Sequence, residues 1–268
     1  MKKITCLLVL SLFACIIPAK HITTNQTDIG ALVCISSSPN YTKISYFTNK
    51  WEQLPELVNE SNVISEEIPL DRVVYKDHFY YESLSDSTKE YIYGKSYKEN
   101  CTVPYESLKY VSIQYYNFNN EVETGEIICN EMIAQDLTEI FYELYLNQYQ
   151  LESIHLVDDY NADDELSMEA NNTSCFNYRS VPGKKALSKH ALGLAIDINP
   201  FYNPYVTHKG SATNITPIGS EIYADRTLDF PHKITENDLC YQLFISHGFT
   251  WGGGWKNSKD YQHFEKKF

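Results

Sequence analysis

The sequence predicts a globular domain of the α+β class, because strand-like and helix-like patterns follow one another along the chain. Residues 110–115 (Tyr-Val-Ser-Ile-Gln-Tyr) are mostly β-branched or aromatic, which is typical of a strand. From Ile133 to Leu144, apolar residues recur at offsets of 4, 7, 8 and 11, which favours an amphipathic helix. The composition agrees with a folded domain, since 43% of the residues are apolar and 21% are charged.

Further segments continue this mixed pattern toward the end of the chain. Residues 125–129 and 151–157 are interpreted as strands. A helix is predicted to begin at residues 235–238, because Thr235-Glu-Asn-Asp238 resembles a capping start and the apolar residues 239, 243 and 244 share one face. Residues 248–268 are first rich in glycine and tryptophan and then strand-like.

The first 19 residues have the pattern of a signal peptide. A short positive start precedes an almost unbroken apolar run over residues 4–17, which is shorter than the about 20 residues that a membrane-spanning helix needs. Cleavage is predicted after Ala19, and the alternatives are lipidation at Cys15 or a retained membrane anchor. We therefore expect an extracytoplasmic protein, either secreted or attached to the cell envelope.

The remaining chain divides into two predicted regions. Residues 20–93 are polar and weakly periodic, so they are interpreted as a linker or N-terminal extension, and residues 94–268 as the functional domain. The net charge of −13 argues against a nucleic-acid partner, because a phosphate backbone would be repelled. Five cysteines follow the leader without any Cys-x-x-Cys pair, so both disulfides and buried thiols remain open.

Three residues form a candidate zinc site. Two histidines, His190 and His263, and the carboxylate of Asp197 make a ligand set that leaves a fourth position for water. A carboxylate between two isoleucines is costly unless it is paired or bound to a metal. Two turns of a helix would bring His190 and Asp197 onto one face, but the intervening Gly193 and the following Asn-Pro favour a loop that runs into a strand.

These residues belong to a longer ordered set of motifs. The set is Ser188-x-His190-x-x-Gly193-x-Ala195-x-Asp197-x-Asn199-Pro200, then Trp251-Gly-Gly-x-Trp255, then Asp260-x-x-His263-Phe264. It resembles the D-alanyl-D-alanine carboxypeptidase family of zinc peptidases, most closely the VanY-like and L-alanyl-D-glutamate endopeptidase branch. The resemblance covers about Gly94 to Phe268, and it departs from the family at Gly254, where relatives commonly carry aspartate.

The resemblance implies a fold and a chemistry. The fold would be a small antiparallel sheet with flanking helices and one zinc ion at the sheet surface, as in hedgehog-like peptidases. His190, Asp197 and His263 would bind the zinc, and Asp260 would be the general base. Strand alternation alone would instead put Glu265 on the same face as His263, so Glu265 is the rival base.

The resemblance also implies how a substrate is held. Arg179 would bind the developing oxyanion or a substrate carboxylate. The remaining expected substrate contacts are Ser188, Tyr178, Trp251 and Trp255, with Asp158 and Asp164 as supporting groups. The substrate would be the peptide stem of peptidoglycan, cut by a carboxypeptidase or an endopeptidase. The alternatives are a zinc-containing wall-binding protein without turnover and, more distantly, a cysteine hydrolase that uses Cys175.

Overall fold

The computed structural model describes residues 32–38, 41–47, 71–181, 185–210 and 212–268. The chain divides into two compact units, Met1–Ser65 and Glu66–Phe268. In the first unit, strand β1 (Leu32–Ser38) pairs with strand β2 (Tyr41–Phe47) in an antiparallel ladder. The predicted signal peptide, with Cys15, lies outside the described residues.

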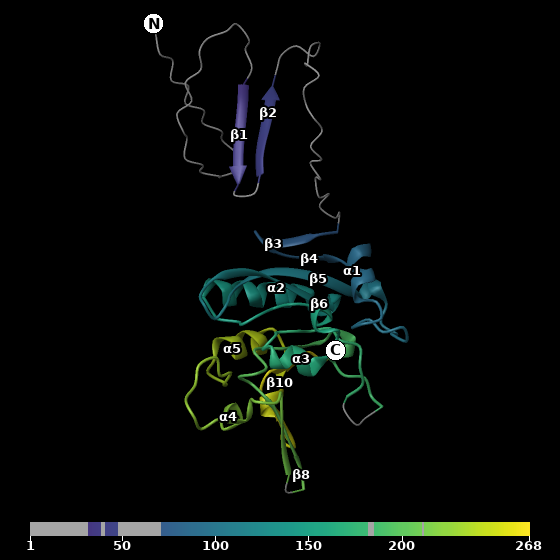
Figure 1. The fold of residues 1–268 in the computed structure, drawn as a ribbon, viewed down its shortest axis with the longest axis vertical. Helices are drawn as coiled ribbons and strands as arrows, with labels where there is room; N and C mark the ends of the chain where they lie inside the picture. The colour runs from purple at the N-terminus through teal and green to yellow at the C-terminus, as the bar shows by residue number, and fades with distance from the viewer. Residues whose placement is uncertain (1–31, 39–40, 48–70, 182–184, 211) are drawn as a thin grey trace. The chain divides into compact units, whose positions relative to one another are not determined.

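The largest sheet of the second unit is antiparallel and has the strand order β3-β4-β5-β6 (Figure 1). Its strands are β3 (Val73–Lys76), β4 (Phe79–Ser83), β5 (Leu108–Tyr116) and β6 (Val122–Asn130). Strands β5 and β6 confirm the strands predicted at residues 110–115 and 125–129. The ladder of β4 and β5 runs from Tyr80↔Ser112 to Ser83↔Lys109.

The folded unit begins before the boundary predicted at Gly94, because β3 and β4 belong to the same sheet as β5. Helix α1 (Asp86–Ile92) follows β4 and is capped by Ser85, whose Oγ accepts the N–H of Thr88 at 3.0 Å. Most residues of β3 are exposed, so this strand lacks the buried alternation that would have revealed it in the sequence.

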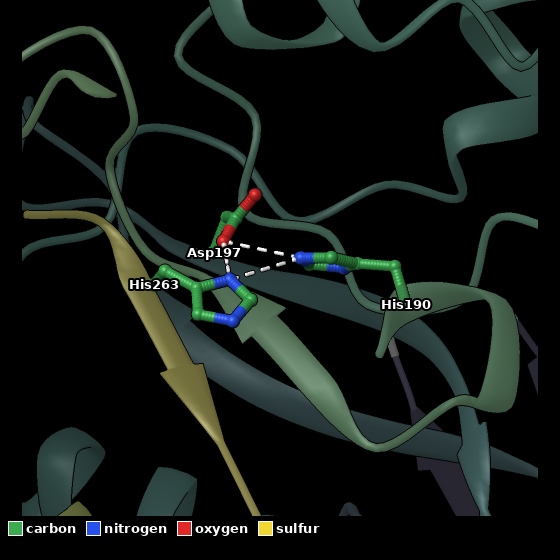
Figure 2. A group of neighbouring side chains, drawn as sticks. All are labelled: His190, Asp197 and His263. Carbon is green, nitrogen blue, oxygen red and sulfur yellow. Dashed lines mark hydrogen bonds and ion pairs between the residues drawn. The ribbon is translucent and has the colours of Figure 1, made fainter. Parts of the chain in front are cut away.

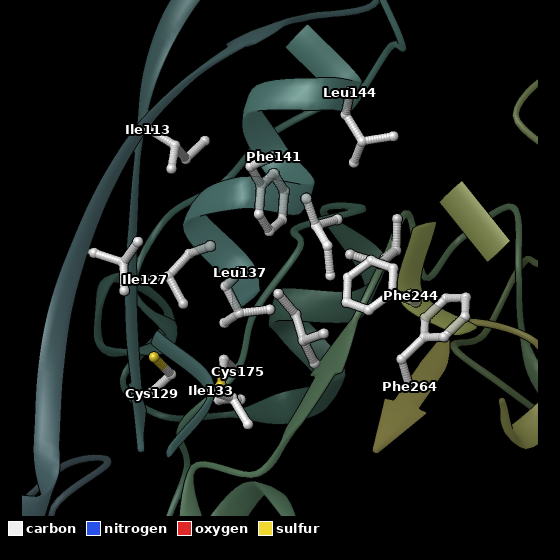
Figure 3. Packing of buried hydrophobic residues seen from close by; sticks show 14 of the residues in the cluster. Ile113, Ile127, Cys129, Ile133, Leu137, Phe141, Leu144, Cys175, Phe244 and Phe264 are labelled. Carbon is white, nitrogen blue, oxygen red and sulfur yellow. The ribbon is translucent and has the colours of Figure 1, made fainter. Parts of the chain in front are cut away.

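Helix α2 (Glu131–Leu146) packs on this sheet with the apolar face that the sequence predicts (Figure 3). Asn130 caps it by accepting the N–H of Met132 at 3.1 Å. Helix α5 (Leu239–Ser246), capped by Asp238, adds Phe244, whose ring stacks on Phe264 at a centroid distance of 4.4 Å. The core therefore joins the large sheet, through α2, to the C-terminal strand that carries Phe264.

The strand predicted at residues 151–157 is wrong. Leu151 and Ile154 are buried, but the backbone makes isolated hydrogen bonds rather than a continuous ladder, among them Leu151 N–H to the Tyr116 carbonyl of β5 at 2.9 Å and Glu126 N–H of β6 to the Ile154 carbonyl at 3.2 Å. The His155 N–H, for example, donates to Asn172 Oδ1 at 2.8 Å. The segment then enters the 3₁₀ helix η2 (Val157–Tyr160). Apolar burial without sheet pairing thus mimics a strand in the sequence.

Two small antiparallel sheets hold the C-terminal half together, and the α+β class is confirmed. One has the order β10-β12-β7 and consists of β7 (Ala195–Asp197), β10 (Thr250–Trp251) and β12 (His263–Glu265). The other has the order β11-β8-β9 and consists of β8 (Tyr205–Lys209), β9 (Ala212–Thr216) and β11 (Ser258–Asp260).

Short helices lie between the strands. They are the helices α3 (Asp164–Glu169) and α4 (Glu221–Ala224) and the 3₁₀ helices η1 (Tyr105–Ser107), η3 (His190–Leu192) and η4 (Gly252–Gly254). Within the described part of the chain, no helix has the length and apolar character needed to cross a membrane.

Candidate metal centre

The centre is built where β7 meets β12. The antiparallel register places His263 directly opposite Asp197, so their side chains emerge on the same face of the sheet. His263 Nδ1 lies 2.9 Å from Asp197 Oδ1 (Figure 2). Asp197 is the last residue of β7, as expected from a loop that leads into a strand.

The 3₁₀ helix η3 brings His190 to the same point (Figure 2). Its Nδ1 donates to the carbonyl of Cys175 at 2.6 Å, which leaves the lone pair of Nε2 facing the centre. His190 Nε2 lies 3.2 Å from His263 Nδ1 and 3.3 Å from Asp197 Oδ1. The alternative of one helix that carries both His190 and Asp197 is therefore wrong.

A tight turn after His190 fixes η3 against the large sheet. Gly193 ends η3 with φ +66°, and its carbonyl accepts the N–H of Asn130 at 2.9 Å. A Cβ at Gly193 would lie 2.6 Å from the Asn130 backbone nitrogen. The junction of β6 and α2 thus sets the position of His190 relative to the strands.

Gly193→Ala is expected to destabilise the protein by at least about 2 kcal/mol, because left-handed strain adds to a backbone clash. Gly94→Ala is the matched control, since Gly94 has φ +79° and open space around its Cβ position. Denaturant unfolding of both variants measures the difference. Equal losses of unfolding free energy would contradict the close packing of Gly193 on Asn130.

The three ligand atoms have separations that fit zinc. Tetrahedral zinc with bonds of about 2.0–2.1 Å holds its ligand atoms about 3.3 Å apart. The separations among His190 Nε2, His263 Nδ1 and Asp197 Oδ1 are 2.9, 3.2 and 3.3 Å. All three residues are buried, and together they form a group able to hold a metal ion. Two imidazoles and one carboxylate are also the donor types of catalytic zinc sites.

The charges of the centre are strongly coupled. Burial would raise the pKa of Asp197, but the adjacent His190 and His263 hold it below its usual value. Burial lowers the pKa of His263, yet its interactions with Asp197 and Glu265 outweigh this effect and raise the pKa to about 10. The metal-free centre therefore keeps a proton on His263, and a metal must displace that proton.

Glu265 orients His263 from the far side of the ring. Its Oε2 lies 3.5 Å from His263 Nε2, and its Oε1 lies 3.1 Å from Lys267 Nζ. The interaction with His263 lowers the pKa of Glu265 to about 2 despite partial burial. Because Glu265 binds the Nε2 side, the Nδ1 of His263 is left for a metal.

Asp260 lies at the end of β11, close to the same centre. Its Oδ1 is buried and has no hydrogen-bond partner among the described residues. Burial, together with the negative charge of Asp197, raises its pKa to about 7 even though the neighbouring histidines act in the opposite direction. Asp260 is thus a carboxyl group that gains and loses its proton near neutral pH.

Gly252 permits the approach of Asp260 and His263. A Cβ at Gly252 would lie 2.7 Å from Asp260 Cβ and 3.2 Å from His263 Cβ. The first residue of the Gly-Gly-Gly run therefore has a packing role at the centre.

Gly252→Ala is expected to weaken zinc binding and to lower any hydrolytic rate by at least about tenfold, because it displaces a ligand or Asp260. Gly254→Ala is the control, since nothing lies within 4 Å of a Cβ added there. Metal content after dialysis and steady-state rates report both effects. If the two variants behave alike, Gly252 does not set the site geometry.

Arg179 lies beside the segment that carries His190. Its backbone carbonyl accepts the N–H of Ser188 at 3.0 Å, and its side chain forms an ion pair with Asp164 of α3. Asp164 thereby holds the guanidinium of Arg179 in place. Asp158 has a different contact: it accepts the backbone N–H and the hydroxyl of Ser96 at 3.0 and 2.8 Å.

The four expected substrate contacts divide into two kinds. The ring of Trp255 lies beside His263, with a centroid separation of 5.3 Å. The other three have partners within the fold. Ser188 Oγ accepts the His190 N–H at 3.2 Å, Trp251 Nε1 donates to the Tyr261 carbonyl at 2.8 Å, and Tyr178 is only 6% exposed within a hydrophobic cluster. The structure thus brings Trp255 to the centre and gives Ser188, Trp251 and Tyr178 packing or capping roles.

Several contributors were not found from the sequence. The Cys175 carbonyl orients His190, and a backbone group leaves no residue-specific signal. The thiol of Cys175 is buried and its pKa is raised well above the usual value, which argues against a nucleophilic cysteine. Asn177 and Gln262 are also buried next to the centre, although the sequence predicted no role for them.

The fold and this buried ligand set define a candidate metallohydrolase centre. Residues 182–266 match the profile of the D-alanyl-D-alanine carboxypeptidase family, and this range contains His190, Asp197, Asp260 and His263. The match confirms the resemblance seen in the sequence and supports a peptidase of this family. Comparisons with curated proteins and with solved structures gave no match.

Proposed function

We propose that this protein is an exported zinc metallopeptidase that hydrolyses the peptide stems of bacterial peptidoglycan. The observation that carries the proposal is the convergence of three buried ligand atoms within 3.3 Å of one another, beside a carboxyl group with a pKa of about 7. The family match at residues 182–266 supplies the substrate class. The proposed architecture of the zinc site is the hedgehog-like one, with the ion at the surface of the β10-β12-β7 sheet.

The proposed zinc ligands are His190 Nε2, Asp197 Oδ1 and His263 Nδ1. A bound zinc ion would supply Lewis-acid polarisation of the scissile carbonyl and a lower pKa for the attacking water. The Cys175 carbonyl holds the tautomer of His190, and Glu265 holds that of His263. The protein therefore fixes both imidazoles before any ligand arrives.

Asp260 is the proposed general base. Its buried, unpartnered oxygen and its pKa of about 7 suit a group that takes a proton from water and passes it to the leaving amine. Glu265 is less suited, because its two oxygens are already paired with His263 Nε2 and Lys267 Nζ. A carboxylate that is held in this way is not free to take a proton from water.

Arg179 is the proposed electrostatic partner of the substrate. Its guanidinium is partly exposed and is oriented by the ion pair with Asp164. A fixed guanidinium can bind the developing oxyanion or a substrate carboxylate through paired hydrogen bonds. Trp255, whose ring lies beside that of His263, is a further proposed substrate contact.

The proposed location is outside the cytoplasmic membrane, because residues 1–19 have the pattern of an export signal. Mass spectrometry of the mature N-terminus tests this proposal. A chain that begins at Lys20 indicates cleavage after Ala19, whereas a lipid on Cys15 indicates anchoring. An intact N-terminus at Met1 would contradict a cleaved signal.

The bond that is cut can be identified by digesting purified peptidoglycan with the mature protein and reading the products by mass spectrometry. Loss of a terminal D-alanine defines a carboxypeptidase, and cleavage within the stem defines an endopeptidase. A chelator should stop either reaction. Stoichiometric zinc without any cleaved stem would instead favour the wall-binding protein, which keeps the metal centre but lacks turnover.

A further inference from the structure

Three buried side-chain oxygens lack a hydrogen-bond partner among the described residues, and all three belong to the neighbourhood of the metal centre. They are Asn177 Oδ1, Asp260 Oδ1 and Gln262 Oε1. The Asn177 N–H donates to the His190 carbonyl at 3.2 Å, and Gln262 directly precedes His263. A buried acceptor without a donor costs about 1–3 kcal/mol, so this grouping calls for a functional explanation.

The contacts of the two carboxamides determine which way their oxygens face. Asn177 Nδ2 donates to Asp164 Oδ1 at 2.7 Å and to the Ala162 carbonyl at 3.1 Å. Both partners are acceptors, so the nitrogen must face them and the oxygen must face away. Gln262 Nε2 lies 3.4 Å from Met168 Sδ, which leaves its Oε1 on the opposite side of the amide.

One short helix holds both carboxamides. Asp164 and Met168 are four residues apart in α3, so their side chains lie on the same face, one turn apart. Asn177 and Gln262 thus dock side by side on α3 through their nitrogens, and each is only 3% exposed. Gln262 also lies two residues from Asp260, the proposed base, in the chain.

We propose that the oxygens of Asn177 and Gln262 form an acceptor pair that binds N–H groups of the substrate peptide beside the metal centre. This inference rests on the proposed function, and it identifies the N–H groups as the feature of the substrate that the protein recognises. Peptide N–H groups and amines satisfy buried acceptors, and the adjacent carboxylates of Asp164 and Asp260 favour such donors further. A substrate without the N–H would leave the acceptors unpaired, which is how polar sites reject analogues.

Gln262→Met tests the protein side of the contact, because methionine keeps the length of the side chain and removes the oxygen. The variant should bind zinc normally and unfold at the same temperature or higher, since an unpaired oxygen is lost. Its kcat/KM for a stem peptide should fall about tenfold, the equivalent of one hydrogen bond. Unchanged kcat/KM would overturn the inference.

Gln150→Met is the matched control. Gln150 Nε2 donates to Asn120 Oδ1 at 2.8 Å, so this amide is already satisfied within the fold. The control should lose stability and keep its kcat/KM, the reverse of Gln262→Met. A loss of stability without a loss of kcat/KM in Gln262→Met would assign a structural role to Gln262 and overturn the inference.

The substrate side is tested with synthetic stem peptides that are N-methylated at one non-scissile amide at a time. One of these peptides should lose about tenfold in kcat/KM with the wild-type protein and much less with Gln262→Met, which is the coupling expected for a direct contact. Equal losses in the two proteins at every position would overturn the inference.

Calorimetric binding of the same peptides to zinc-loaded Asp260→Asn separates the two proposals. If N-methylation weakens binding only when Gln262 is present, but the wild-type protein cleaves none of the peptides, the proposed peptidase is contradicted and the acceptor pair is supported. If the wild-type protein cleaves the peptides but the effect of N-methylation does not depend on Gln262, the acceptor pair alone is contradicted. If no stem peptide binds or is cleaved, both proposals fail.

Discussion

Asp197→Asn is expected to abolish zinc binding and hydrolysis and to destabilise the protein by about 3–5 kcal/mol. Asp197 Oδ1 is the atom shared by His190 and His263, and its pKa is held below the usual value by these two neighbours. The substitution therefore removes a metal ligand and leaves a buried histidine charge without its partner, which is the costly way to break a buried ion pair. Metal analysis, a peptidase assay and denaturant unfolding measure the three effects.

Asp136→Asn is the matched control for this substitution. Asp136 also contacts a histidine, His247, at 3.2 Å, and it pairs with Lys266 at 2.7 Å. This group is partly exposed, so its loss should cost about 1 kcal/mol or less and leave zinc and activity intact. A zinc-containing, active Asp197→Asn protein would contradict the assignment of the metal centre.

The second large effect is expected when either of the two carboxylates near His263, Asp260 or Glu265, is replaced by its amide. The two variants should lose activity for different reasons. Asp260→Asn should lower kcat by about 10²–10⁴-fold while zinc stays bound, because it removes the group that moves the proton. Glu265→Gln should weaken zinc binding by about 10–100-fold, because it loosens the orientation of His263. Excess zinc should restore the rate of Glu265→Gln and leave that of Asp260→Asn unchanged.

These two carboxylates are distinguished by titrating zinc into each variant while following stem-peptide cleavage. If Glu265→Gln stays inactive at saturating zinc and Asp260→Asn retains a wild-type rate, Glu265 is the base and the assignment of Asp260 is wrong. The pH profile of the wild-type rate gives an independent check. It should rise as Asp260 loses its proton, with a midpoint below the pKa of about 7 that Asp260 has in the metal-free protein, because a bound zinc ion favours the ionised carboxylate.

The sequence was sufficient for those parts of the fold that local patterns specify. The period of α2 identified its buried face, and the capping sequence at residues 235–238 located the start of α5 to within a few residues. Strand β3 was missed because most of its residues are exposed, and residues 151–157 were misread because their backbone makes isolated hydrogen bonds to β5, β6 and loops rather than a continuous ladder. In the second case the deciding partners lie far away in the sequence.

The candidate site was likewise predictable in part: the types of its residues could be predicted from the sequence, and the orientations of their atoms could not. The ligand residues could be predicted because their types and order carry the chemistry, and the structure brings His190, Asp197 and His263 together. The roles of Glu265, the Cys175 carbonyl and Gln262 depend on which atom faces which partner. Such orientations arise from strand register and turn geometry, which short sequence motifs do not encode.

Reconstitution with zinc tests the central claim most directly. The purified protein would be stripped of metal with a chelator, dialysed, and titrated with zinc while the cleavage of a peptidoglycan stem peptide is measured. Activity should be absent at the start, rise linearly and reach its maximum at one zinc per chain. Full activity in the stripped protein, or one bound zinc per chain without any cleavage, would contradict the zinc peptidase.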